Sequence, residues 1–296
     1  MKIFQKRKHF PFFQVLLFAF CCLYLINAPT IRVSVRSSLQ LCGNALIPSL
    51  FPILVFSRLL TSPVGGGQGR SESAFRLFSK PLILGWIFGY PVGAMLMSEA
   101  IPSQNKNRQA PLLYLSCGTS ATFILSFVGY SLLENPILGV LLYLSQTLAL
   151  FLLSLPHLLF FGKAEIGAAA CIKDQISLSE GIRRAALDML FICGCVLFFG
   201  SFADLLTLYL PRNVLLFLIP WIEVCGAVSR LSAENGAISR LLLGFSVGFG
   251  GFSATLQMLP YVKKGGGTAR GLLGMRFLVG VLTALFFFTF SSLQGS

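Results

Sequence analysis

The chain has 296 residues, of which 55% are hydrophobic and 11% are charged. Soluble domains carry about 25% charged residues, so the composition excludes a soluble globular protein and indicates an integral membrane protein with a single membrane domain. The formal net charge is +13. Basic residues in short loops account for this charge better than nucleic-acid binding, because no basic stripe alternates with aromatic residues.

The first apolar run extends from 10 to 28 and follows a basic N-terminus. A basic start before an apolar run also fits a signal peptide. This run is longer than a usual signal core, and further apolar runs follow it. We therefore predict an uncleaved transmembrane helix within residues 1–38, with 29–38 as a short loop.

The first half of the chain continues with a run at 39–60 that contains Pro48 and Pro52. These prolines lack backbone donors, so we expect a kinked or broken helix. The segment at 81–98 is short and is interrupted by Gly89-Tyr90-Pro91-Val92-Gly93. Such an interruption is typical of a transporter's discontinuous helix or re-entrant hairpin. Full spans are predicted to follow, at 111–131 and 137–161.

The second half begins with a polar loop at 162–184, and Ser179 beside Glu180 predicts a helix start near its end. A second short, broken segment is expected at 214–229, where Pro220 and Gly226 interrupt an apolar run. Full spans are predicted around this segment, at 185–209, 240–259 and 272–293. The expected fold is an all-α polytopic membrane protein with about seven transmembrane helices and two short re-entrant or broken helices.

Two short motifs recur at one spacing. Ser120-Ala121-Thr122 recurs as Ser253-Ala254-Thr255, 133 positions later, and Gly93-Ala94 recurs as Gly226-Ala227 at the same spacing. The common spacing indicates an internal duplication, although a few identities also arise by chance. We expect a first repeat at 39–161, a cytoplasmic loop at 162–184, and a second repeat with the final span at 185–296.

The distribution of basic residues predicts the orientation. With a cytoplasmic N-terminus and two re-entrant segments, 18 of the 23 lysines and arginines fall on the inner side of a bacterial cell membrane. The repeats then have opposite orientations, as in transporters whose site lies at the repeat interface. If both short segments cross the membrane fully, the repeats are parallel instead.

The candidate solute-binding residues are glycines, hydroxyl and amide residues at the two recurring clusters, with Tyr90 and one acid. Glu223 is that acid, and a carboxylate in an apolar segment indicates a functional site or a buried partner. The alternatives are an interfacial Glu223 and small residues that only pack helices closely. The full set is Gly89, Tyr90, Gly93, Gly118, Thr119, Ser120, Thr122, Glu223, Gly250, Gly251, Ser253, Thr255 and Gln257.

No catalytic motif is visible, and no histidine or cysteine has partners at metal-ligand spacing, so we expect no enzyme activity, no cofactor and no metal. An intramembrane enzyme whose groups meet only in the fold is the open alternative. The expected partners are the lipid bilayer and a small polar solute. Self-association into a homo-oligomer is left open.

Four stretches resemble the sporulation integral membrane protein YlbJ family, namely Pro48–Pro52, Gly89–Ala94, Ser116–Phe127 and Gly248–Gln257. That family is related to the nucleoside-recognition, or Gate, domains of concentrative nucleoside transporters and ferrous-iron transporters. The resemblance implies a multi-pass protein of spore cortex formation that transports or binds a small polar or nucleoside-like solute. The alternative is a membrane scaffold for sporulation that transports nothing.

Overall fold

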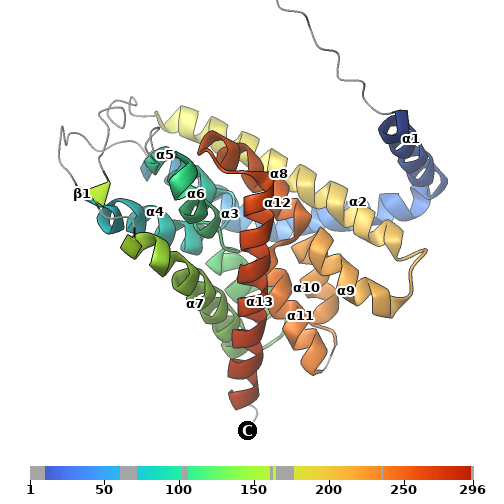
Figure 1. The fold of residues 1–296 in the computed structure, drawn as a ribbon. Helices are drawn as coiled ribbons and strands as arrows, with labels where there is room; N and C mark the ends of the chain where they lie inside the picture. The colour runs from blue at the N-terminus through green and yellow to red at the C-terminus, as the bar shows by residue number, and fades with distance from the viewer. Residues whose placement is uncertain are drawn as a thin grey trace, which may run out of the picture.

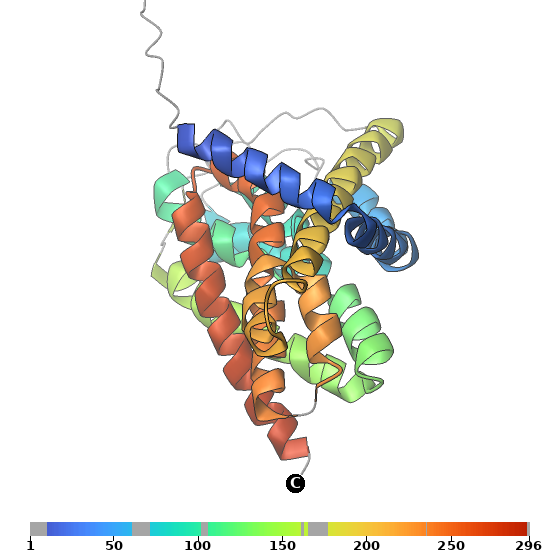
Figure 2. The same ribbon diagram turned by 90° about the vertical axis from the view of Figure 1, so that its right-hand side faces the viewer.

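The computed structural model describes residues 11–60, 72–101, 106–160, 163–164, 177–234 and 236–294. Almost all of them lie in helices (Figures 1 and 2). Two short strands, β1 (Glu72–Ser73) and β2 (Lys163–Ala164), pair antiparallel. The helices are α1 (Pro11–Ile26), α2 (Ala28–Leu41), η1 (Cys42–Leu46), α3 (Ile47–Leu60), α4 (Ala74–Phe88), α5 (Val92–Ala100), α6 (Lys106–Leu115), η3 (Phe123–Leu132), α7 (Pro136–Phe160), α8 (Leu178–Leu206), α9 (Arg212–Ile222), α10 (Val224–Leu231), α11 (Ala237–Phe249), α12 (Gly251–Lys264) and α13 (Ala269–Gln294).

Four helical segments of the described chain are long and apolar enough to cross a membrane. A fifth is added if α1 and α2, which meet at an angle of 89°, count as one bent span. These lengths support a helical membrane protein. They do not establish seven spans, which stay a prediction. The four segments are Pro136–Leu159, Leu178–Leu206, Ala237–Lys264 and Ala269–Gln294.

The segment expected to be a short loop at 29–38 is helical, and this expectation was wrong. It belongs to α2, which packs along α8 (Figure 1). Two arginines and several serines gave it a loop-like composition, and Ile31, Val33 and Val35 alternate along it and do not recur at helical spacing, so the local pattern gave no sign of the helix. Ser34 is buried against α8, where its hydroxyl donates to Asp204 Oδ2 at 2.5 Å.

The long helix α8 starts slightly earlier than Ser179, the predicted start. Ser177 is the N-cap, and its hydroxyl accepts a hydrogen bond from the backbone N–H of Glu180 at 3.3 Å. Ser177 and Glu180 have the spacing of a capping box. The residue types that signal a helix start were therefore read correctly, with the cap placed two positions too late.

Four interruptions divide the middle of the fold into half-helices. Two fall within the short segments expected to be broken: α4 ends before Gly89, and Glu223 separates α9 from α10. The other two fall at the glycine-rich clusters within the spans expected at 111–131 and 240–259. Residues 116–120 separate α6 from the helical residues that lead into η3, and Gly250 separates α11 from α12. Gly250 has φ +81° and Gly251 has φ +75°, a left-handed conformation that ends an α-helix and favours glycine.

The order of helices and interruptions recurs at the spacing found in the sequence. Helix α7 begins at Pro136 and α13 begins at Ala269, 133 positions later. Tyr90 lies in the interruption between α4 and α5, and Glu223, also 133 positions later, lies between α9 and α10. The spacing of 133 positions that a few identities share thus also separates corresponding elements along the chain.

Both predicted repeats contribute to a shared interior. Helix α13 packs along α11 and also against α7, while α8 packs against α2 and α3 (Figures 1 and 2). Each of the two hydrophobic clusters draws buried residues from both halves of the chain. Elements far apart in sequence are therefore held side by side around the four interruptions.

Candidate functional site

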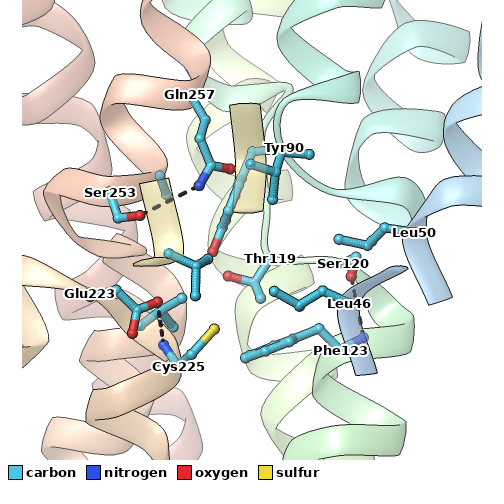
Figure 3. Close-up of a pocket in the computed structure, with 14 residues that line it drawn as sticks. Leu46, Leu50, Tyr90, Thr119, Ser120, Phe123, Glu223, Cys225, Ser253 and Gln257 are labelled. Atoms are coloured by element: carbon cyan, nitrogen blue, oxygen red, sulfur yellow. Dashed lines mark hydrogen bonds between the residues drawn. The ribbon is translucent and has the colours of Figure 1, made fainter. Parts of the chain in front are cut away.

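The interruptions bring six polar side chains to one small cavity, which we call the central pocket. Its volume is about 40 Å³, enough for one or two water-sized groups. Figure 3 shows Glu223 and Ser253 on one side, with Thr119 and Ser120 facing them from the other half of the chain. The polar lining consists of Tyr90, Thr119, Ser120, Glu223, Ser253 and Gln257.

Glu223 is the acid of this pocket, and it is 2% exposed. It is the N-cap of α10: Oε1 accepts from the backbone N–H of Cys225 at 2.8 Å, and Oε2 accepts from that of Gly226 at 2.6 Å. Amide donors and the positive end of the helix dipole both stabilise a carboxylate at this place. The buried carboxyl group is thus held by backbone groups while the side chain lines the cavity.

The first cluster, at 118–120, is fixed by hydrogen bonds from distant helices. Gln146 of α7 accepts from the backbone N–H of Thr119 and donates to its carbonyl, both at 2.9 Å. The Thr119 hydroxyl donates to the Val247 carbonyl at 2.7 Å, and Tyr90 N donates to the Gly118 carbonyl at 2.9 Å. These bonds satisfy backbone groups that the broken helix leaves open.

Arg276 connects the two clusters from behind the pocket. Its side chain is fully buried; Nε donates to the Phe249 carbonyl at 2.9 Å and Nη1 donates to the Cys117 carbonyl. These carbonyls directly precede Gly250 and Gly118, the glycines of the two clusters. Helix C-termini carry partial negative charge, which suits a cation at this position. The guanidinium also lies 5.8 Å from the Tyr90 ring centroid.

Three glycines let the interrupted segments touch. A Cβ on Gly89 would lie 2.6 Å from Ser120 N, and one on Gly251 would lie 2.9 Å from the Ile222 carbonyl oxygen. Gly93 approaches the Ser116 carbonyl oxygen still more closely, because a Cβ there would lie 1.8 Å away. Larger side chains would separate the segments that carry the pocket residues.

The remaining candidates do not line the central pocket. The Thr255 hydroxyl donates to the Gly251 carbonyl of its own helix at 3.1 Å, and Thr122 lines a neighbouring cavity. Gly118 lies against the Gln146 side chain, and Gly250 lies near Arg276 and Tyr90. Thr255, Gly118 and Gly250 therefore lie beside the residues of the central pocket, whereas Thr122 belongs to the neighbouring cavity.

Arg276 was counted only among the 18 basic residues of the predicted inner side and was not identified as a buried residue. The residue lies within α13, and its depth inside an apolar run was the signal that could have identified it. Gln146 was missed because an amide among apolar residues carries no comparable signal. The apolar wall of the pocket, which includes Leu46, Phe123 and Ile192, has no sequence signature either.

Two ion pairs on α8 lie on either side of the pocket residues Ile192 and Val196. Toward the start of α8, Asp188 Oδ2 pairs with Arg58 at 2.5 Å, and Tyr261 donates to Oδ1 at 2.8 Å. Toward its end, Asp204 pairs with Arg230 and accepts from Ser34. Asp188 and Asp204 are about 24 Å apart along the helix at 1.5 Å per residue.

The pocket offers one carboxylate, hydroxyls and an amide, a set that hydrogen-bonds a polar solute. Gln257 Oε1 is buried and accepts no hydrogen bond from any described residue, so it is available to a bound donor. Comparisons of the chain with family models, with curated proteins and with solved structures returned no match.

Proposed function

We propose that the chain is a multi-pass membrane protein that binds and transports a small polar solute at the central pocket. The supporting observation is the convergence of four helix interruptions on buried Glu223, Ser253 and Gln257. Polar groups at the interface of two broken-helix repeats characterise the sites of many secondary transporters. The resemblance to the YlbJ family adds a role in sporulation, during formation of the spore cortex.

The proposal includes two repeats of opposite orientation, within 39–161 and 185–296, around seven spans. The recurrence of helices and interruptions at one spacing favours a duplication. The excess of basic residues on one side favours the opposite orientation. A site between such repeats is reached from alternate sides when one repeat moves against the other.

Uptake by proteoliposomes tests transport directly. Purified protein is reconstituted and screened with labelled nucleosides, sugars and amino acids, with protein-free liposomes as the baseline. We expect uptake of at least one solute, and a loss of that uptake in Ser253→Ala but not in Ser292→Ala. Ser253 lines the pocket, whereas Ser292 is exposed near the end of α13.

Complementation tests the role in sporulation. An endospore-forming strain that lacks its own YlbJ-family member should regain heat-resistant spores when it expresses this chain. Restored spores without uptake or solute-induced thermal stabilisation would favour the scaffold over the transporter. Uptake without restored spores would retain the transporter and remove the sporulation role.

A further inference from the structure

A second, larger cavity adjoins the central pocket. Its volume is about 310 Å³, and it lies between η1 with the start of α3 on one side and η3 on the other. Leu46 and Phe123 line both cavities, so their side chains form the wall between them. Figure 3 shows these two residues across the central pocket from Glu223 and Ser253.

The larger cavity is lined by uncharged polar groups and aromatic rings. Asn44, Thr122 and Ser126 provide an amide and two hydroxyls, and Phe127 provides an apolar surface. Within the described chain, no hydrogen bond joins these three polar side chains to another residue. The lining contains no charged residue among those that the structure describes. Its chemistry suits a neutral solute with hydrogen-bonding groups and an apolar face.

The two cavities differ in exposure. Asn44, Pro48 and Ser126 are exposed, so the larger cavity is open at the molecular surface. Leu46 is only 4% exposed and Phe123 only 6% exposed. The central pocket behind them is therefore closed on this side by two apolar side chains.

We propose that the larger cavity is a vestibule through which a small uncharged polar solute reaches the central pocket, with Leu46 and Phe123 as the gate. The use of this path by a solute rests on the proposed transport function. The vestibule lies within the size range of small-molecule sites, about 300–1,000 Å³, whereas the central pocket holds only water-sized groups until the gate residues move.

The local helix geometry supports a movable gate. Leu46 is the last residue of the π-helical η1, and Phe123 is the first residue of the π-helical η3. π-Helical hydrogen bonds run from residue i to i+5, which shifts the register of a helix, and π-helical segments occur often at functional sites. A change of register at either segment would rotate its gate residue away from the wall.

Thiol labelling in membrane vesicles tests the vestibule and the gate without any assay of transport. Ser126→Cys and Ser253→Cys are each treated with a charged, membrane-impermeant methanethiosulfonate applied to either face. Modification at each position is quantified by peptide mass spectrometry, which separates it from the native cysteines. We expect labelling at 126 and almost none at 253. Adding Leu46→Ala and Phe123→Ala should raise labelling at 253 several-fold.

Leu285→Cys is the control for an exposed apolar position, and it should stay unlabelled by the charged reagent. If the double alanine variant fails to fold, as judged by size-exclusion chromatography, Leu46→Ala alone serves. If the cysteine at 126 reacts with membrane-permeant N-ethylmaleimide but not with the charged reagent, lipid or another chain fills the cavity. That result would overturn the vestibule. Equal labelling of 253 with and without the native gate residues would overturn the gate. Neither result depends on whether uptake is found.

Discussion

Glu223 combines two roles that are usually separate, because it caps a helix and also lines a cavity. Both carboxylate oxygens accept backbone N–H groups of α10. An N-cap residue contributes about 1 kcal/mol to stability. A cap needs only an acceptor, which serine also supplies, whereas recognition of a solute donor or a proton needs the carboxylate itself. The two roles are therefore separable by substitution.

We expect Glu223→Gln to reduce uptake and spore formation strongly while it lowers stability by only about 1 kcal/mol. Glutamine keeps the shape and one acceptor oxygen but removes the charge. Glu223→Asp should retain more activity, and Glu223→Ser should retain the cap without the activity. Uptake and thermal unfolding are measured side by side, with Glu234→Gln as the control outside the pocket. Full activity of the glutamine variant would reduce Glu223 to a cap and leave the hydroxyl clusters as the site.

Arg276 illustrates a buried charge that stabilises the site without lining it. We expect Arg276→Met to lower the unfolding temperature, because two buried carbonyls lose their donor and each costs about 1–3 kcal/mol. Arg276→Lys should recover only part of the loss, since an ammonium lacks the planar fork that reaches both carbonyls. Arg270→Met, at an exposed position nearby, is the control. A wild-type unfolding temperature for Arg276→Met would contradict the role assigned to the guanidinium.

At the scale of elements, the site depends on helices that stop and restart inside the fold. The backbone N–H of Tyr90 donates to the Gly118 carbonyl. Glu223 lies against Gly251, where a Cβ would be 3.0 Å from the backbone nitrogen of Glu223. Tyr90 and Gly118 lie 133 positions before Glu223 and Gly251, so equivalent positions lie close together in each half, joined by a backbone hydrogen bond in the first half. The pocket is built at the junction of these two contacts.

We expect Gly251→Leu to abolish uptake and spore formation while the protein still reaches the membrane. The residue has φ +75°, and a Cβ would lie 3.0 Å from Glu223 N, so leucine is excluded by conformation and by space. Membrane fractions are compared by immunoblot with function in the complementation assay. Gly274→Leu is the matched control, because a Cβ there meets no atom within 4 Å. Wild-type function of the leucine variant at 251 would exclude a close contact at this interruption.

The ion pair between α3 and α8 makes a separate prediction. We expect Asp188→Asn to destabilise the protein by about 1–3 kcal/mol, because Arg58 is 11% exposed and loses the charge-assisted hydrogen bond to Asp188. Combining it with Arg58→Met should recover part of the loss, which a double-mutant cycle of unfolding free energies measures. Glu180→Gln, whose partners are largely exposed, should change stability little and serves as the comparison. Purely additive effects would show that the pair contributes no coupling.

At the scale of the whole molecule, the orientation is a prediction that fusions can test. We expect a cytoplasmic N-terminus and an external C-terminus, since most basic residues lie on one predicted side and the predicted number of spans is odd. Removing the buried Arg276 from the basic residues leaves this imbalance in place. Reporters are fused after Ser296 and within 162–184. A cytoplasmic signal at Ser296 would contradict the topology and the opposite orientation of the repeats.

The sequence by itself determined the class of the protein and the extents of several of its helices. Composition excludes a soluble fold, since too few charged residues remain to cover a surface. The extents of α7 and α13 follow from long apolar runs, and the interruptions near Tyr90 and Glu223 fall within the short segments that glycine and proline mark. These features are local, because backbone sterics and apolar length act within a segment.

Only the tertiary structure decided which interruptions meet and what holds them together. The sequence did not show that the first glycine cluster would break the span expected at 111–131, nor that α2 would replace a loop. Arg276 and Gln146 form hydrogen bonds with backbone groups far away in the chain, and Leu46 and Phe123, also distant in sequence, line the same two cavities. Such pairings depend on packing between distant segments, where each broken helix must satisfy its open backbone groups in an apolar interior.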